Sequence, residues 1–260
     1  MTARVLIVAG SDSGGGAGIQ ADIKTVTMLG GHAMTAITAI TAQNTLGVQA
    51  VLPVPADMVI AQINSVVADI GVDAVKIGMI GSAATANAVA DVLERIDAPV
   101  VFDPVMVATS GSALADDQTI AAFTRLMRVA TVTTPNLPEA EALGGVEAML
   151  GHGTTILLKG GHADGGTLTD RLIGAAGEVA RWDNPRIATP HTHGTGCTLA
   201  SGIATGLAQG LPLEEAVARA IRFVRAALIA APGLGQGHGP MGHALGVAPF
   251  DVIAGRRCRG

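Results

Sequence analysis

The residues with the clearest chemical potential lie at the start of an apolar stretch near the end of the chain. Three small residues, Gly194, Thr195 and Gly196, come directly before Cys197, and a helix is predicted over residues 198–209. Small residues at a helix N-terminus leave backbone N–H groups open to an anion, which suits the charge that develops on a transferred phosphoryl group. Cys197 is either a small buried residue or a reactive thiol whose pKa the helix N-terminus lowers, and the preceding glycines favour the reactive thiol.

A second candidate group lies in the segment TPNLPEAEAL, residues 134–143. Asn136 and Glu139 have the spacing of a helix start, in which the asparagine caps the helix and the glutamate answers its positive end. That structural role accounts for the pair on its own. At a strand exit beside a phosphate site, Glu139 is also a candidate ligand for magnesium with its water molecules.

Two further charged residues follow buried strands. Asp103 comes directly after a strand predicted at residues 100–102, and it is either a turn former or a carboxylate linked to a metal. Lys159 follows a strand predicted at residues 155–158 and precedes two glycines. It is either a surface lysine or a point charge that contacts a phosphate. For both residues the two interpretations stay open.

Gln43 stands at a strand end inside a region, residues 25–56, that contains no charged residue. A carboxamide offers a donor and an acceptor together, which suits a heterocyclic base with an amino group and a ring nitrogen, although a loop amide can also satisfy backbone groups. The glycine-rich segment 9–22 follows a strand, but no acidic residue ends the next strand, which disfavours a dinucleotide site. The chain contains no P-loop motif, no Gly-x-Ser-x-Gly turn and no His-Glu-x-x-His helix.

These residues need a scaffold that brings several strand ends together. Short apolar runs alternate with amphipathic stretches up to residue 158, which predicts a parallel sheet with helices on both faces. Ligands of such sheets bind at the carboxyl ends of the strands. Polar residues or glycines stand at these ends, namely Gly10, Gln43, Gly78, Asp103, Asn136 and Lys159. From residue 160 the pattern changes to a glycine-rich loop with a small antiparallel hairpin, and two helices follow.

The composition excludes several classes of protein. The 260 residues are 49% hydrophobic and 14% charged, which excludes intrinsic disorder. A formal net charge of -5 and the scarcity of aromatic residues argue against a nucleic-acid partner. Two cysteines cannot build a disulfide framework, and we find neither a signal peptide nor a spanning segment. We therefore expect a cytoplasmic protein without a membrane partner.

Taken together, the motifs resemble one family. The segments AGSDSGGGAGIQADIKT, TAITAQNT, KIGMIG, FDPVMVATSG, TPNLPEAEAL, LLKGGH and HGTGCTLASGIA occur in this order. They are similar to the hydroxymethylpyrimidine and hydroxymethylpyrimidine-phosphate kinases of thiamine biosynthesis, a branch of the ribokinase-like superfamily, over most of residues 4–245. The resemblance implies an α/β fold, a three-layer α/β/α sandwich with a mostly parallel central sheet and a small β flap or lid. It also implies ATP and Mg²⁺ as cofactors and a homodimer.

The resemblance also implies roles for the first group of residues. Gly194, Thr195 and Gly196 would form the anion site. Cys197 would occupy the position where most of the superfamily carries an aspartate base, and it would help to accept or orient the hydroxyl proton. Lys159 would reach the nucleotide phosphates. The glycine-rich stretch that follows Lys159 would close over the ligands and exclude water.

For the remaining residues the resemblance implies contacts with metal, phosphate and substrate. Asn136 and Glu139 match a signature tied to magnesium and phosphate, and Asp103 would assist at the metal. Gln43 would hydrogen-bond the pyrimidine. Two further residues, Gly10 and Asp22, would lie on the substrate side.

The activity implied is the transfer of the γ-phosphoryl group of ATP to 4-amino-5-hydroxymethyl-2-methylpyrimidine and then to its monophosphate. Pyridoxal kinase is the alternative, since it uses the same fold and some members share the cysteine. A regulatory protein that binds a nucleotide without catalysis is an alternative of a different class.

One departure from the family pattern is visible between residues 143 and 155. The family usually places a full helix there, and only the segment 144–153 fills the interval in this chain. One covering helix is therefore predicted to be shortened or missing. We expect a single kinase domain over residues 1–250 and a flexible tail at residues 251–260.

Overall fold

The computed structural model describes residues 1–108, 111, 114–162 and 165–245, so the tail expected at 251–260 lies outside the described residues. The strands are β1 (Arg4–Asp12), β2 (His32–Asn44), β3 (Gly47–Pro53), β4 (Ala74–Ile77), β5 (Val100–Phe102), β6 (Val132–Thr133), β7 (Thr155–Leu158), β8 (Thr167–Gly174) and β9 (Gly177–Pro185). Within the described residues they form one nine-stranded sheet in the order β3-β2-β1-β4-β5-β6-β7-β8-β9.

The sheet is parallel in its centre and antiparallel at its two edges. Parallel pairing runs from β2 through β1, β4, β5 and β6 to β7. β3 pairs antiparallel with β2 at one edge, and β8 and β9 continue the sheet antiparallel to β7 at the other. The mostly parallel sheet is thus confirmed. The hairpin expected after residue 160 is also confirmed, and it extends the central sheet.

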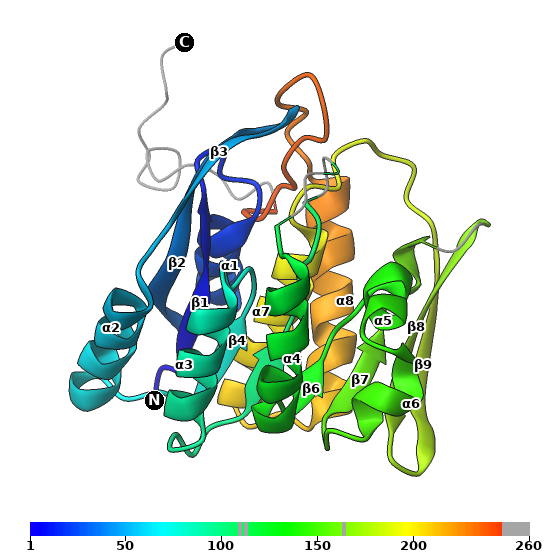
Figure 1. Cartoon of the computed structure of the whole chain (residues 1–260). Coiled ribbons are helices and arrows are strands. Elements are labelled where there is room, and N and C mark those ends of the chain that lie inside the picture. Colours follow the sequence, from blue (N-terminus) through cyan, green and yellow to red (C-terminus); the bar gives the residue numbers. More distant parts are fainter. Residues whose placement is uncertain (109–110, 112–113, 163–164, 246–260) are drawn as a thin grey trace.

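Helices cover both faces of this sheet, as Figure 1 shows. They are α1 (Gly18–Met28), α2 (Ala56–Asp69), α3 (Ala83–Leu93), α4 (Asp117–Val129), α5 (Leu137–Ala142), α6 (Gly145–Leu150), α7 (Thr195–Ala208) and α8 (Leu213–Ile229). α1, α7 and α8 pack on one face, and α2 to α6 pack on the other. The three-layer α/β/α arrangement predicted from the sequence is confirmed.

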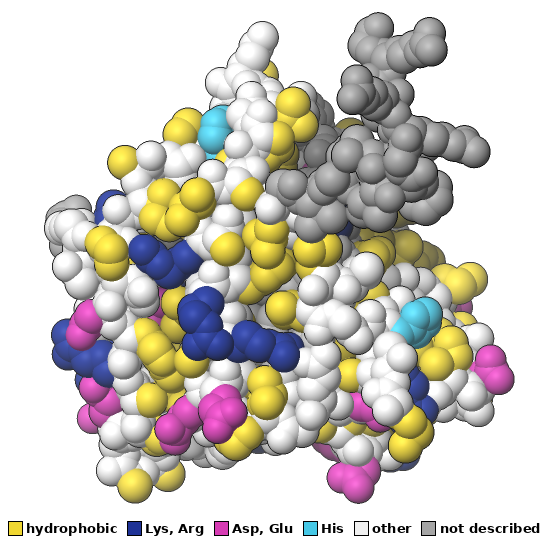
Figure 2. All heavy atoms as spheres, turned by 180° about the vertical axis from the view of Figure 1, so that it is seen from behind, with side chains coloured by type: hydrophobic (Ala, Val, Ile, Leu, Met, Phe, Trp, Pro, Cys, Tyr) yellow, Lys and Arg dark blue, Asp and Glu magenta, His cyan; other side chains and the backbone are white. Residues whose placement is uncertain are grey.

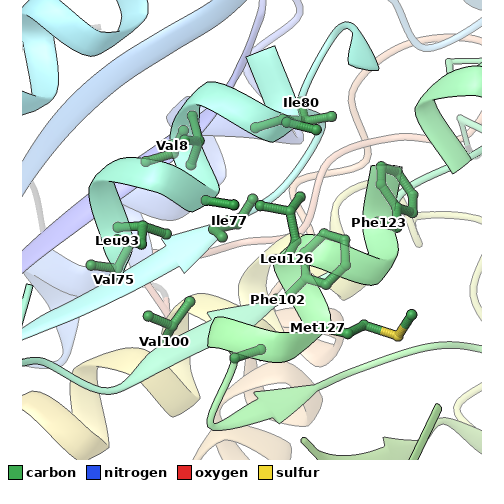
Figure 3. Packing of buried hydrophobic residues seen from close by; sticks show 14 of the residues in the cluster. Val8, Val75, Ile77, Ile80, Leu93, Val100, Phe102, Phe123, Leu126 and Met127 are labelled. Atoms are coloured by element: carbon green, nitrogen blue, oxygen red, sulfur yellow. The ribbon is translucent and has the colours of Figure 1, made fainter. Parts of the chain in front are cut away.

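Each face of the sheet has its own hydrophobic core, because successive side chains of a strand point to opposite faces. In β1, Val5 and Ile7 pack toward α1, α7 and α8, while Leu6 and Val8 pack toward the other helices. Figure 3 shows the second core between the strands and the helices α3 and α4. There the rings of Phe102 on β5 and Phe123 on α4 meet edge to face, with centroids 5.1 Å apart. The sheet is therefore held rigidly from both sides.

Two strands near the first edge differ from the sequence expectation. The apolar, threonine-rich run at residues 33–42 predicts a strand, whereas β2 continues to Asn44 and turns back into β3. β3 (GVQAVLP) is mostly apolar yet mostly exposed, so its sequence shows no alternation of apolar and polar residues that would predict a strand. The longer β2 carries Gln43 beyond the body of the sheet, where it lies beside the opening of the site.

The predicted shortening of one covering helix is confirmed. Only α6, six residues long, lies between α5 and β7, and its Met149 side chain is fully buried against the sheet. Gly144, the residue before α6, has a left-handed backbone with φ +85°. This sharp turn lets α5 and α6 cover β6 and β7 within a short segment. The strand end that carries Lys159 keeps its place in the sheet.

The back of the molecule is the face that α1, α7 and α8 cover. Figure 2 shows basic side chains gathered across the middle of this face. α8 carries three arginines at three-residue spacing, Arg219, Arg222 and Arg225. Arg225 donates to the carbonyl oxygen of Pro185 at 2.8 Å and so ties α8 to the end of β9. In the described part of the chain, none of the helices is long and apolar enough to cross a membrane.

The segment after α8 returns to the start of α7 and buries a histidine there. The His243 ring lies 2.8 Å from the Thr198 hydroxyl and is 3% exposed. Burial lowers the pKa of His243 to about 4, with Lys24 acting in the same direction. As the pH falls from about 6.5 toward 4, the His243 side chain is protonated in the unfolded chain but not in the folded protein. The free energy of unfolding therefore decreases by about 3 kcal/mol over this interval.

We expect a His243→Gln variant to lose less stability over this pH interval than the parent protein, as measured by urea unfolding. The matched control is His238→Gln, because His238 is exposed. An equal loss in the parent and in His243→Gln would show that other groups govern the acid sensitivity.

Candidate active site

A cavity of about 890 Å³ opens at the carboxyl ends of the parallel strands. Its volume falls among those of pockets for small molecules, roughly 300–1,000 Å³. Its wall contains the strand ends and helix start that the sequence singled out, namely Gly10, Gln43, Asp103, Asn136, Glu139, Lys159, Gly194, Thr195, Gly196 and Cys197. At the end of β4, Met79 contributes to the wall. The fold thus collects nearly all of the candidate residues around one space.

A charged cluster occupies one side of this cavity. Lys159 Nζ lies 2.8 Å from Asp103 Oδ1 and 3.7 Å from Glu139 Oε2. The Thr134 hydroxyl donates to the same Asp103 oxygen at 3.0 Å. The side chains of Lys159 and Asp103 are 15% and 2% exposed. Lys159 is therefore part of the cavity wall, and its interpretation as a surface lysine is wrong.

Burial and pairing set the charges in this cluster. Burial lowers the pKa of Lys159, but the nearby carboxylates of Asp103 and Glu139 raise it more, so the pKa stands above its ordinary value. Burial raises the pKa of Glu139, and Lys159 offsets only part of that effect. The lysine is consequently a permanent cation in the wall of the cavity.

The N-terminus of α7 begins directly beside this cation. A Cβ on Gly196 would lie 3.3 Å from Asp103 Oδ2 and 3.5 Å from Lys159 Nζ. The first turn of a helix has N–H groups without partners inside the helix, and they carry partial positive charge. The segment 194–197 and Lys159 therefore form one positively polarised surface. Such a surface suits phosphate oxygens.

Cys197 lines the same cavity, but the expectation of a thiolate is wrong. Burial raises the pKa of Cys197 to about 11. Lys76 and the amide of Gly18 lower it, and the carboxylates of Asp22 and Asp103 raise it further. Burial of the sulfur outweighs the opposing effects of Lys76 and the Gly18 amide. The residue is a neutral thiol that faces the cavity.

Asn136 and Glu139 form a reciprocal helix cap. Asn136 Oδ1 accepts from the Glu139 amide, and Glu139 Oε2 accepts from the Asn136 amide, both at 2.8 Å. The structural interpretation of the pair is therefore confirmed. The cap also fixes where the Glu139 carboxylate stands, next to Lys159 and in the wall of the cavity. A capping role and a ligand role are thus compatible for this residue.

The donor set around Lys159 fits a magnesium ion that arrives with a nucleotide. Among the described residues, no three His, Cys, Asp or Glu side chains are grouped to hold a metal ion by themselves. Magnesium in kinases is bound by one or two carboxylates together with phosphate oxygens and water. Asp103 and Glu139 provide two carboxylates that share a lysine as counter-ion. The residues present therefore fit Mg²⁺ only in combination with phosphate.

The opposite end of the cavity carries hydrogen-bonding side chains. The Gln43 carboxamide nitrogen lies 3.3 Å from His193 Nε2, and its oxygen accepts from the Thr41 hydroxyl at 3.1 Å. His193 Nε2 also lies 2.9 Å from Asp12 Oδ2. Asp12 accepts backbone N–H groups from the loop before α1, which fixes the loop and the histidine together. Gln43 is therefore held at the cavity wall by its neighbours.

Gly10 gives this end of the cavity its depth. A Cβ at Gly10 would lie 3.1 Å from the sulfur of Met79. The following helix comes close as well, since a Cβ on Gly18, which has φ +53°, would overlap the carbonyl oxygen of Gly10. A larger residue at either position would push the wall inward or move α1 away from β1.

Asp22 does not lie at the cavity, which corrects the expectation that it is on the substrate side. It is fully buried between α1, α7 and β4. Its carboxylate accepts from Lys76 Nζ at 2.8 Å and from the Ser201 hydroxyl at 2.7 Å. Asp22 is the fifth residue of α1, and it lies on the buried face of the helix. A substrate contact is thus replaced by an internal ion pair.

Sequence reasoning missed several residues of the site. Lys76, Asp12 and His193 line the cavity, and none of them is among the candidates that the sequence predicts. Lys76 carried a usable signal, because it interrupts an otherwise apolar strand, AVKI, in which every side chain is buried. Asp12 and His193 carried none, since their pairing joins positions 181 residues apart.

A third region of the cavity wall is apolar. It is formed by the segment after β9 and by one side of α8, with Ile187, Ile221, Val224 and Leu228. It lies beyond the charged cluster, and Asp170 and Asn184 contribute polar atoms beside it. Asp170 accepts from the Gly160 amide at 3.0 Å. An apolar slot with a few polar groups is the usual environment of a flat heterocyclic ring.

An anion site with a fixed lysine, two carboxylates beside it, and an apolar slot on an α/β/α sheet define a phosphotransferase of the ribokinase-like class. The family described as phosphomethylpyrimidine kinase matches residues 12–242 of the chain. The chain therefore belongs to the phosphomethylpyrimidine kinase family, as its motifs predicted.

Curated relatives support this membership. A hydroxymethylpyrimidine/phosphomethylpyrimidine kinase from Rhizobium meliloti is 48% identical over 260 residues, which cover 94% of this chain and 97% of the relative. The bifunctional thiamine biosynthesis protein ThiED from Geobacter sulfurreducens is 50% identical over 93% of this chain. The match spans 52% of that longer protein, so the chain corresponds to about half of it.

Solved structures confirm the fold and include two kinds of kinase. The ADP complex of Bacillus subtilis pyridoxal kinase has a TM-score of 0.86 and 33% identity, covering 94% of this chain and 98% of that one. A phosphomethylpyrimidine kinase from Clostridium difficile has a TM-score of 0.74 and 37% identity, covering 86% and 98%. The pyridoxal kinase thus has the higher TM-score, whereas the phosphomethylpyrimidine kinase has the higher sequence identity. Identity carries more weight for the substrate, because side chains set specificity whereas the fold is shared.

Proposed function

We propose that the protein transfers the γ-phosphoryl group of ATP to the hydroxymethyl oxygen of 4-amino-5-hydroxymethyl-2-methylpyrimidine, and then a second one to the monophosphate. The observation that carries the proposal is the position of Gly196 against the Asp103 and Lys159 side chains, in a cavity that also holds Gln43. In this proposal the anion site lies between the hydrogen-bonding end and the apolar end of the cavity. Family membership and the identity to the Rhizobium meliloti kinase support the choice of substrate.

In this proposal ATP lies with its base in the apolar slot beside Ile221 and Val224 and with its phosphates at Lys159. The phosphates meet the ammonium of Lys159 and the N-terminal amides of α7. Phosphoryl transfer needs alignment and neutralisation of charge more than covalent chemistry, and these groups supply both. The β8–β9 hairpin borders the same end of the cavity and would help to exclude water there.

The pyrimidine lies at the other end, against Gln43 and Gly10. The carboxamide of Gln43 can accept from the amino group of the ring and donate to the neighbouring ring nitrogen. The absence of a side chain at Gly10 leaves room for the flat ring beside Met79. The hydroxymethyl oxygen then points toward the start of α7, where Cys197 and the anion site are found.

Magnesium accompanies the nucleotide in this proposal, and Asp103 and Glu139 would hold it. When bound, the ion neutralises charge on the phosphate oxygens. Asp103 and Lys159 remain neighbours whether or not the ion is present, because Asp103 also accepts from Thr134. Asn136 keeps Glu139 in place through the helix cap and contacts phosphate at the cavity wall.

Cys197 acts as a neutral thiol near the attacking oxygen. With its pKa raised to about 11 by burial, it orients the hydroxyl proton better than it removes it. A loose transition state needs little assistance from a base. In the second phosphorylation the attacking oxygen belongs to a phosphate and is already ionised, so no base is needed.

A Cys197→Ala variant is therefore expected to lose about tenfold in kcat on the alcohol and less than about twofold on the monophosphate. A coupled assay of ADP release measures both rates. Cys197→Ser serves as the control, because it keeps a hydrogen-bonding group of similar size. Rates near those of the parent on both substrates would remove Cys197 from the mechanism.

The same assay tests the proposed function. The pyrimidine alcohol, its monophosphate and pyridoxal are each supplied with ATP and magnesium, and ADP release is followed. We expect turnover of the alcohol and the monophosphate and much slower turnover of pyridoxal. Faster turnover of pyridoxal would favour the alternative kinase, which the superposition on the Bacillus subtilis enzyme keeps open. Nucleotide binding without ADP release on any substrate would indicate a regulatory protein.

Three further properties belong to the proposal. Residues 1–250 act as one kinase domain, because one sheet forms both ends of the cavity. The protein works in the cytoplasm, where ATP is available. It forms a homodimer, for which the exposed apolar side chains of Ile40, Leu46 and Leu52 at the β2–β3 edge are candidates. Light scattering combined with gel filtration measures the number of copies.

A further inference from the structure

A buried ion pair lies beneath the cavity and has no role in the mechanism above. Lys76 on β4 and Asp22 on α1 are joined at 2.8 Å, and both side chains are 0% exposed. The Ser201 hydroxyl on α7 donates to the other Asp22 oxygen at 2.7 Å. The desolvation free energy of two buried charges exceeds their electrostatic attraction unless the geometry is good. Apolar residues of similar volume often give a protein of equal stability. The pair therefore calls for an explanation beyond stability.

The pair has a definite orientation relative to the cavity. Lys76 belongs to the cavity wall and Asp22 does not. Among the described residues, Asp22 Oδ2 is the only acceptor within hydrogen-bonding distance of Lys76 Nζ, which leaves two donors of the ammonium. Both Asp22 oxygens are engaged on the far side, by Lys76 and Ser201. The positive end thus faces the cavity and the negative end faces the helices.

The neighbours of Lys76 make room for this orientation. A Cβ on Gly78 would lie 2.6 Å from Lys76 Nζ, so only glycine leaves the ammonium its place. The ammonium lowers the pKa of Cys197, although burial keeps that pKa above its ordinary value. Ser201 of α7 donates to Asp22, so the ion pair packs against α7 as well as α1. Cys197, in the first turn of α7, lines the same cavity as Lys76.

We propose that Lys76 is a positioning residue for phosphoryl transfer, whose buried ammonium, anchored by Asp22, adds a fixed positive field behind the N-terminus of α7. The inference rests on the proposed function. A preorganised dipole in a region without water stabilises charge that develops in the transition state, because it does not need to reorganise during the reaction. Lys159 acts on the phosphate oxygens from the cavity wall, and Lys76 acts on them through the α7 amides from below.

The experiment replaces the pair by two matched neutral pairs. Lys76→Met with Asp22→Leu is apolar, and Lys76→Gln with Asp22→Asn keeps a hydrogen bond between the two positions. The control is Thr133→Val with Thr154→Val, which removes a buried hydroxyl pair, 2.9 Å apart, that is not part of the cavity wall. Thermal unfolding, the Kd for ADP by calorimetry, and kcat and KM are measured for each.

We expect both neutral pairs to fold, to bind ADP within about threefold of the parent and to lose roughly thirtyfold in kcat, with KM little changed. The threonine control is expected to keep its kcat. A folded neutral pair with a kcat within about twofold of the parent would overturn the inference. Failure of both neutral pairs to fold would also overturn it, because the ion pair would then be structural. If the parent protein releases no ADP with the pyrimidine substrates, the proposed function itself fails.

Discussion

Replacing Lys159 by methionine is expected to lower kcat roughly a thousandfold, the largest effect that we expect from a single substitution in the cavity. The ammonium lies at the α7 N-terminus, 3.5 Å from the position of a Cβ on Gly196, and it keeps its charge because Asp103 and Glu139 raise its pKa. A transferred phosphoryl group gains contact with this cation as the transition state forms. The loss should therefore appear mainly in kcat, with a smaller rise of the KM for ATP.

The measurement is steady-state kinetics with the pyrimidine alcohol over a range of ATP concentrations. Lys159→Arg is the conservative variant, and we expect it to recover only part of the rate, because a guanidinium cannot replace a compact ammonium between two carboxylates. Arg95→Met controls for the loss of a positive charge at an exposed position. A Lys159→Met protein that is folded and keeps more than about a tenth of the parent kcat would show that the lysine does not act on the transferred group.

The architecture and most of the cavity could be predicted from the sequence, because both depend on local patterns. Alternating apolar and amphipathic segments fix a parallel sheet, and parallel strands bring their carboxyl ends to one edge. Asp103 and Lys159 each follow a short apolar strand, so their meeting at that edge is a consequence of the topology. The motif resemblance added the chemistry that could not be read from either residue alone.

Other features depend on contacts between distant segments and could not be predicted in this way. The Asp22 side chain is drawn inward because Lys76 and Ser201 meet it from two other elements. The pKa of Cys197 depends on how completely α1 and the sheet exclude water from the sulfur, which the local motif does not encode. Asp12 and His193 meet only because the loop before α1 touches the segment before α7. In each case tertiary packing decides what the side chain can do.

The two interpretations of Asn136 and Glu139 illustrate how a local rule and a functional role can coincide. The reciprocal cap satisfies the first amides of α5. The hydrogen bond from the Asn136 amide restricts the rotamers of Glu139, so its carboxylate stays beside Lys159. The helix start is thus a positioning device for the carboxylate. The capping role and the ligand role of Glu139 therefore do not exclude each other.

Gly194→Ala is expected to cost more than about 3 kcal/mol of stability and to lower kcat roughly a hundredfold in the protein that remains folded. Gly194 has a left-handed backbone with φ +87°, and a Cβ there would overlap the carbonyl oxygen of Gly16. The overlap would push the start of α7 away from the loop before α1. Urea unfolding measures the first effect, and ADP release with saturating substrates measures the second.

Gly210→Ala is the matched control, because Gly210 follows the other end of α7 with φ +81° and a Cβ there would meet no atom within 4 Å. The Gly210→Ala variant introduces the backbone strain of a left-handed alanine without a steric overlap. We expect it to lower the free energy of unfolding by about 1 kcal/mol and to leave kcat unchanged. The difference between the two variants isolates the close approach of Gly194 to Gly16. Equal losses in both would mean that the contact between these loops does not hold the α7 amides in place, and the anion site would then need another support.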